Sequence, residues 1–153
     1  MRKIPFAMLL LMLCAVPPAS AGEGLVSVKS SHGAKETADR VERLVKERGM
    51  TLFNRIDHAE GARKIGMELR PTEVLIFGNP KGGTPLMQCK QSAGIDLPLK
   101  MLVWKDEGGV VRVGYNDPES LKDRYGIKGC DEVLRKMKGA LEKLASDASR
   151  PGS

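Results

Sequence analysis

The chain has 153 residues and a formal net charge of +6, and only 4% of its residues are aromatic. This length suits a single domain with one core, and the interleaved charges indicate a solvated surface. The few aromatic side chains form no cluster of the kind that stacks on single-stranded bases, so we expect no nucleic-acid partner.

Residues 1–21 have the composition of a secretory signal peptide. Two cations precede a short apolar stretch, and Ala19-Ser20-Ala21 provides a small-residue cleavage site. Cys14 follows a leucine where lipidation requires a small residue, which favours cleavage over a lipid anchor. We therefore expect a periplasmic or secreted protein that is cleaved after Ala21 and has no membrane association afterwards.

The first half of the expected domain alternates strands and helices. Residues 25–29 alternate weakly between apolar and polar side chains, as a short strand does, and an amphipathic helix is predicted over 34–49. Residues 50–58 alternate as a second strand, and a short helix over 59–65 follows. This order predicts helices packed against a sheet.

The second half contains the clearest strand signals. Residues 73–77 form the most hydrophobic run, which we place centrally in the sheet. Residues 99–105 and 110–115, separated by Asp106-Glu107-Gly108-Gly109, are typical of a β-hairpin.

Two further helices are predicted towards the C-terminal end. Asp117 is the expected N-cap and Pro118 the first residue of a brief helix that ends near Gly126. The last helix begins near Cys130, and its apolar stripe comprises Val133, Leu134, Met137, Leu141 and Leu144.

Together these elements predict one α+β domain over residues 22–148, followed by a disordered tail over 149–153. We expect two layers, with a mixed, largely antiparallel sheet and helices packed on one face. A doubly wound sheet is the weaker alternative because the hairpin interrupts the alternation of strands and helices.

The Gly-rich stretch IFGNPKGGTP, residues 76–85, is a candidate binding segment. Its spacing resembles a phosphate-binding P-loop, but the lysine expected after the last glycine is missing, which argues against nucleoside triphosphates. Backbone amides around Lys81-Gly82-Gly83, with Thr84 as N-cap of a short helix, provide an anion site. The alternative is that the glycines only let the chain turn and that Thr84 only caps the helix.

His58 is the candidate acid or base. In the expected strand its side chain and that of Asp57 point to opposite faces, so any carboxylate partner comes from elsewhere, such as Asp96 or Asp117. A hydrogen-bonded structural histidine is the alternative. No serine or cysteine occupies a recognisable nucleophile setting.

Cys89 and Cys130 remain after cleavage, and they either form one disulfide or stay as separate thiols. No metal site is expected, because the spacings Cys-x-x-Cys and His-x-x-x-His are missing. No cofactor fingerprint is found.

The run from Asp57 to Pro118 carries the motifs DHA, LRPT, FGNP, GTPLM, DLPLK and YNDP in that order. With these motifs the chain closely resembles domain-of-unknown-function family three hundred and two, found in bacteria and archaea. The resemblance implies a compact α+β fold whose members can pair as dimers, and it implies no settled reaction. The residues that match its motifs are Asp57, His58, Arg70, Asn79, Gly83, Thr84, Asp96, Asn116 and Asp117.

We interpret the chain as a non-catalytic domain that binds a small ligand or a protein partner. One version of this hypothesis is that the small ligand is an anion. The homodimer of the family is an open alternative to a foreign partner. The expected ligand-binding residues, gathered at one end of the sheet, are Asn79, Lys81, Gly82, Gly83, Thr84, Arg70 and Asn116. Two alternatives are a hydrolase or lyase that uses His58 with Asp96, and a thiol or metal-handling protein that uses the two cysteines.

Overall fold

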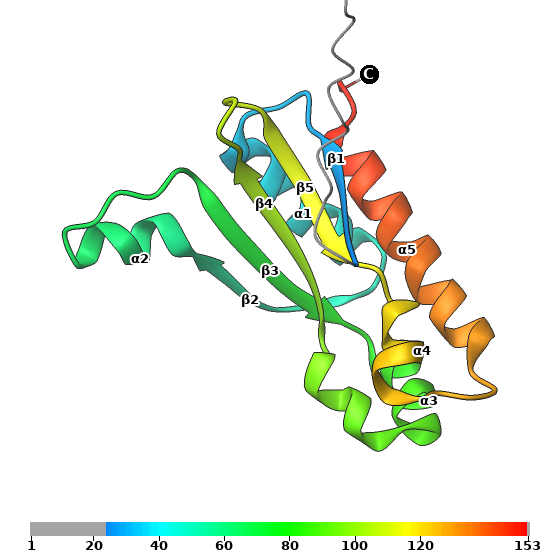
Figure 1. Ribbon diagram of the computed structural model, residues 1–153. Coiled ribbons are helices and arrows are strands. Elements are labelled where there is room, and N and C mark those ends of the chain that lie inside the picture. Colours follow the sequence, from blue (N-terminus) through cyan, green and yellow to red (C-terminus); the bar gives the residue numbers. More distant parts are fainter. Residues whose placement is uncertain (1–23, 153) are drawn as a thin grey trace, which may run out of the picture.

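The computed structural model describes residues 24–152, so the predicted signal peptide over 1–21 lies outside the described residues. Five strands form one sheet in the order β1-β5-β4-β3-β2 (Figure 1). The strands are β1 (Leu25–Lys29), β2 (Thr51–Asp57), β3 (Thr72–Gly78), β4 (Leu99–Lys105) and β5 (Val111–Asn116). The helices are α1 (Ala34–Glu47), α2 (His58–Lys64), α3 (Pro80–Cys89), the 3-10 helix η1 (Gln91–Asp96), α4 (Ser120–Tyr125) and α5 (Asp131–Ser149).

The predicted α+β class is confirmed, with one refinement to the sheet. Each of the four strand pairings is antiparallel, whereas we expected a mixed sheet. The reason lies in the connections: α3 and η1 both stay at the end of the sheet where β3 stops, so β4 starts there and runs back. The strand predicted as central, β3, is an interior strand, and β4 occupies the middle.

One face of the sheet carries the core. Alternate residues of β3, β4 and β5 point to this face, and α1 and α5 cover it with apolar stripes at helical spacing. The buried side chains of this cluster are Ala38, Val41, Val45, Leu75, Phe77, Met101, Val103, Val113, Tyr115, Leu141, Leu144, Ala145 and Ala148. Burial of each large side chain stabilises the fold by about 1.5 to 3 kcal/mol before entropy is counted.

The second predicted strand ends one residue earlier than expected. Asp57 is the N-cap of α2, and its side chain accepts a hydrogen bond from the backbone N–H of Glu60 at 2.8 Å. His58 is therefore the first residue of a helix, and the expected strand geometry for the pair was wrong. The register also shifts between Leu52 and Asn54, so the alternation expected along this strand is interrupted there.

Helix α4 begins later than expected. The Asp117 side chain accepts a hydrogen bond from the N–H of Glu119 at 3.0 Å, which closes a turn before the helix. The helix itself starts at Ser120 and ends at Tyr125, and the left-handed backbone of Gly126 forms the predicted C-terminal stop.

The C-terminal helix is longer than expected. It extends to Ser149, whose carbonyl accepts a hydrogen bond from the N–H of Ser31 at 2.9 Å. The His32 side chain donates from Nε2 to the carbonyl of Arg150 at 2.6 Å. These bonds anchor positions 149 and 150, which sequence composition had assigned to the tail. Among the helices described, none combines enough length with enough apolar character to cross a membrane.

Candidate functional site

A cavity of about 580 Å³ opens where α3, η1 and α5 meet the end of the sheet. We call this part of the molecule, comprising α3, η1, α4 and the first half of α5, the cavity end (Figure 1). The α3 wall supplies Asn79, Pro80, Lys81, Gly82, Gly83, Thr84, Pro85 and Met87. The Gly-rich segment singled out in the sequence therefore lines the larger of the two cavities described.

The α5 wall is built by helical spacing. Val133, Met137 and Ala140 recur at intervals of four and three residues, which places them on one side of the helix. Met137 is buried and Val133 half-buried, while Ala140 is exposed near the opening. Part of the apolar stripe that we predicted on this helix thus lines a cavity.

The sheet end and η1 complete the cavity. Met50 precedes β2 and Phe53 lies within it, while Leu97 and Pro98 lead into β4, which begins at Leu99. With the α5 residues, these side chains make the walls predominantly apolar. Such walls exclude water and favour an apolar ligand surface.

The described lining contains two cations, Lys81 and Lys136, and no carboxylate. Lys136 pairs with Glu132 at 2.7 Å within α5, and both side chains are mostly exposed. An exposed pair of this kind contributes little stability and exchanges readily with another anion. The electrostatic character of the opening is therefore positive.

The backbone amides proposed as an anion cradle are already bonded. Helix α3 begins at Pro80, and Asn79 is its N-cap, with Oδ1 accepting from the N–H of Lys81 at 2.9 Å. The N–H groups of Gly82 and Gly83 both donate to the carbonyl of Asn79. The expectation that Thr84 is the N-cap was wrong, because Asn79 caps the helix and Pro80 starts it one turn earlier. The glycines lie in the first helical turn and not in a loop.

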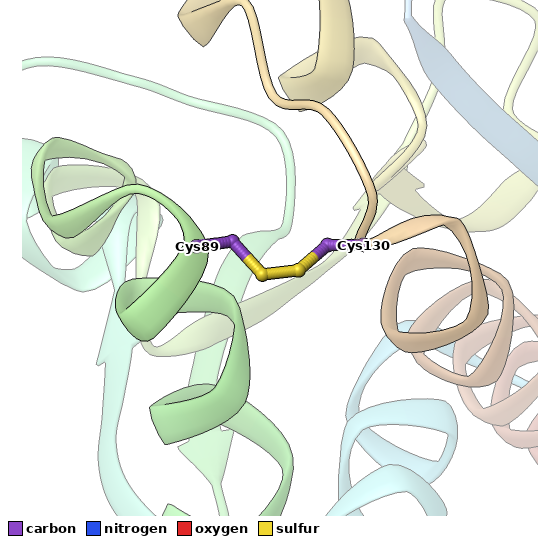
Figure 2. The surroundings of a disulfide bond; sticks show 2 residues. All are labelled: Cys89 and Cys130. Carbon is purple, nitrogen blue, oxygen red and sulfur yellow. A yellow bond between two sulfur atoms is a disulfide. The ribbon is translucent and has the colours of Figure 1, made fainter.

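A disulfide joins the two main walls of the cavity (Figure 2). It links Cys89, the last residue of α3, to Cys130, the residue before α5, with the two α-carbons 6.5 Å apart. Of the two states left open by the sequence, the bonded one is present. The sequence separation of 41 residues means that the bond closes a long loop.

A second cavity of about 430 Å³ lies between the start of β4, the end of β5 and α4. Asp96 and Asn116 line it, as do Lys100 and Arg124. The Asp96 carboxylate accepts from the Tyr125 hydroxyl at 2.6 Å and from Arg124 Nη1 at 3.0 Å. The Tyr125 hydrogen bond, and then Arg124, hold the pKa of the Asp96 carboxyl below its usual value. Asp96 thus clamps η1 to α4 as a carboxylate.

His58 and Arg70 lie at the opposite end of the sheet. Asp57, the neighbour of His58, pairs with Glu73 of β3, and Glu73 pairs in turn with Val103 of β4. Asp96 instead lies before Leu99, the first residue of β4. Four residue steps of β4, about 13 Å of strand, separate the two positions. The expectation that the polar motif residues gather at one end was wrong for these two.

Neither His58 nor Arg70 has the setting expected of a site residue. His58 is exposed, and its ring takes part in none of the hydrogen bonds or ion pairs found within residues 24–152. Arg70 donates from Nε to the carbonyl of Lys105 at 3.2 Å, which ties the segment before β3 to the hairpin. Over the same residues, no group of three or more acidic, histidine or cysteine side chains is placed to hold a metal ion.

Several cavity residues were missed by sequence reasoning, among them Met50, Met87, Lys136 and Ala140. The two on α5 had a detectable signal, since Lys136 and Ala140 follow Val133 at three and seven residues. Met50 and Met87 had no such signal in the sequence, because only the tertiary fold brings these two residues to the same cavity.

These observations define a small α+β domain with an apolar, positively edged cavity at one end of an antiparallel sheet. Residues 26–144 match the family described as Domain of unknown function DUF302. The chain belongs to this family, as the ordered motifs from Asp57 to Pro118 predicted.

Two curated relatives are 45% identical to this chain over 113 residues. They are named Fluoride-specific ion channel FluC 1, from Brucella suis biovar 1 and Brucella abortus biovar 1. The matched part is 74% of this chain but only 44% and 42% of those proteins, so the chain spans less than half their length. The name belongs to the whole of those proteins and supports no specific function for this chain.

A solved structure shares the fold. It is the crystal structure of an uncharacterized conserved DUF302 protein from Bacillus stearothermophilus, with a TM-score of 0.75 and 22% identity. The similarity covers 84% of this chain and 99% of that one. It confirms the architecture of the domain.

Proposed function

We propose that this protein is a non-catalytic binding domain whose small ligand enters the cavity between α3 and α5. The observation that carries the proposal is the cavity itself, about 580 Å³ in volume and lined mainly by apolar side chains. Its volume falls in the usual range of about 300 to 1,000 Å³ for small-molecule pockets, which are likewise apolar with a few polar groups.

The arrangement of titratable groups favours binding over catalysis. The candidate acid or base, His58, belongs to α2, and the cavity is formed by other elements. Asp96, its expected partner, is held as a carboxylate by Tyr125 and Arg124. A general base must lie within hydrogen-bonding reach of the reacting group, and these two residues share no such place.

A neutral fluorescent probe tests the proposal. N-phenyl-1-naphthylamine brightens in apolar surroundings, and we expect saturable binding to the wild-type protein. Ala140→Trp places an indole at the opening and should weaken binding at least about tenfold. Gly139→Trp is the matched control, since Gly139 lies on the same helix, does not line the cavity and has open space beside it. Loss of binding in both variants, or no saturable binding by the wild type, would contradict the proposal.

We also propose that two copies of the chain pair through the projecting unit formed by β2, α2 and the segment leading to β3, which we call the arm (Figure 1). Five large apolar side chains are exposed there: Phe53, Ile56, Ile65, Met67 and Leu69, at 55%, 36%, 73%, 61% and 49%. Strand β2 is also an edge strand, so its outer backbone groups are open to pairing. A two-fold dimer interface brings together the same patch of both copies. The exposed apolar side chains of the arm form one such patch.

Sedimentation velocity tests this pairing. We expect the wild type to sediment as a dimer at micromolar concentration and Ile65→Glu/Met67→Glu as a monomer. Ile95→Glu is the control, because Ile95 is 79% exposed but belongs to the cavity end. A monomeric wild type, or an Ile65→Glu/Met67→Glu variant that remains dimeric, would refute the pairing.

Finally, we propose that the chain acts in the periplasm or outside the cell. The disulfide between Cys89 and Cys130 supports this location, because such bonds persist in oxidising compartments. Intact-mass analysis of the protein from its own cells should show loss of residues 1–21. A mass that retains these residues would contradict the proposal.

A further inference from the structure

We infer that the ligand of the α3–α5 cavity is an amphipathic anion, with an apolar body and one anionic head group held by Lys81 and Lys136. This inference rests on the proposed function and adds the chemical class of the ligand. Both lysines line the cavity, one from α3 and one from α5. An anion at the opening is therefore approached by a cation from each wall.

The chain itself neutralises only one of the two cations at this opening, Lys136, through an exposed pair with Glu132. No aspartate or glutamate lines the cavity among the residues described. Lys138 by contrast has two partners, pairing with Asp117 at 2.9 Å and with Glu119 at 3.0 Å. Lys81 takes part in none of the ion pairs found within residues 24–152, so its ammonium group is available to a ligand.

The second cation, Lys136, has a partner that a ligand can replace. Its pair with Glu132 joins two exposed side chains, at 76% and 69% exposure. Water screens such a pair, whereas a ligand head group at the edge of an apolar cavity is screened less. Exchange of Glu132 for the ligand anion is therefore favourable once the apolar body is bound.

The inner walls define the other part of the ligand. Val133 and Met137 of α5 lie along one side, and Met87 and Leu97 come from α3 and the segment after η1. Methionine side chains are flexible and adapt to different apolar shapes. The cavity therefore suits a flexible chain better than a single rigid ring system.

The occupied amides exclude a different class of anion. Phosphate and sulfate are usually held by several free backbone N–H groups at a helix start. Here the N–H groups of Lys81, Gly82 and Gly83 are bonded to Asn79. The charged groups that the site offers an anion are therefore the two lysine side chains and not a set of free backbone N–H groups, which suits a singly charged head group such as a carboxylate.

Displacement of bound N-phenyl-1-naphthylamine tests the inference. The competitors are decanoate, the neutral 1-decanol of equal chain length, and inorganic phosphate. We expect decanoate to displace the probe at a concentration about tenfold lower than decanol, and phosphate to displace none. In Lys81→Gln/Lys136→Gln the advantage of decanoate over decanol should disappear while probe affinity is retained.

The charge control is Lys35→Gln/Lys143→Gln, which removes two exposed lysines that do not line the cavity. It should leave the decanoate advantage intact. The assignment of an anionic ligand is overturned if decanoate and decanol displace the probe equally from the wild type, or if both double variants lose the decanoate advantage equally. Binding in the cavity would stand in either case. Displacement by phosphate as effective as by decanoate overturns the requirement for an apolar body. Absence of probe binding overturns the cavity as a ligand site.

Discussion

The cavity end and the arm contain similar apolar residues but are stabilised in different ways. At the cavity end, Leu86 and Leu134 are buried in a cluster that the Cys89–Cys130 disulfide joins covalently. In the arm, Ile65 and Met67 are exposed. The base of the arm is held to α1 by charged groups around Arg55.

Arg55 is the centre of that ionic cluster. Its Nη1 lies 2.7 Å from Asp39 and 3.0 Å from Glu42, both on α1, and its Nη2 donates to Glu73 on β3 at 3.1 Å. Glu73 contacts Arg55 Nε as well, and the side chain of Arg55 is only 23% exposed. The comparison teaches that hydrophobic composition alone does not identify the buried part of this chain.

Removal of the disulfide should have the largest effect on stability. In Cys89→Ser/Cys130→Ser we expect the free energy of unfolding to fall by about 3 to 4 kcal/mol, because the unfolded chain regains the freedom of a long loop. Urea titration measures the change. Hydrogen exchange should quicken first in α3 and the start of α5, not in the arm. A loss below about 1 kcal/mol would mean that apolar packing alone holds the cavity end.

Loss of Arg55 should have the next largest effect, and at the other end of the molecule. In Arg55→Met three carboxylates lose their shared partner and repel one another, so we expect a loss of about 2 kcal/mol in urea titration. Arg43→Met is the control, because the one ion pair of Arg43 within residues 24–152 is an exposed pair with Glu47. That pair contributes less than about 0.5 kcal/mol. Equal losses in the two variants would contradict the role assigned to the cluster.

The Asp96 clamp should have a smaller effect that depends on pH. Its folded pKa lies below the usual value of 3.8, so its stabilisation is complete above that value and is lost as the pH falls through the folded pKa. Asp96→Asn should therefore lower the free energy of unfolding by about 1 kcal/mol at pH 7.

Urea titrations of wild type and Asp96→Asn from neutral to strongly acidic pH would follow this difference. We expect the two proteins to converge as the Asp96 carboxylate becomes protonated. A stability difference that stays constant across the acid range would show that the hydrogen bonds of Asp96 do not depend on its charge.

Replacement of an exposed apolar residue of the arm should have the smallest effect. Ile65→Ser should change the stability of the monomer by less than about 0.5 kcal/mol, because the side chain is 73% exposed. Thermal unfolding at concentrations low enough to keep the protein monomeric measures this change. A larger loss would mean that Ile65 packs within its own chain, and the contrast between the two regions would fail.

Much of the fold could be predicted from local patterns. The hairpin of β4 and β5, the stripes of α1 and α5 and the stop at Gly126 depend on neighbouring residues, and all were found. Two of the errors arose where a side-chain cap competes with continuing a strand or loop. Asp57 and Asn79 each start a helix earlier than composition indicated, since one side-chain oxygen satisfies an N–H of the first turn.

The candidate site was predicted only in part. The segment from Asn79 to Thr84 does line the cavity, but as a helix with its amides bonded. Its opposite wall on α5 was predicted only as an apolar stripe, because helical spacing shows which residues share a face but not what that face meets. The second lysine of the opening, Lys136, was therefore missed.

The sequence by itself determined the class of the domain and most of the elements, because side-chain periodicity and turn chemistry act over a few residues. Its ordered motifs, from Asp57 to Pro118, predicted the family. Only the tertiary structure decided which helices and side chains lie together at each end of the sheet. Strand order and direction come from long-range pairing, which brings α3 to α5 and leaves His58 on a different end from Asp96. The cavity exists because two helices more than forty residues apart in the chain are joined by packing and by one covalent bond.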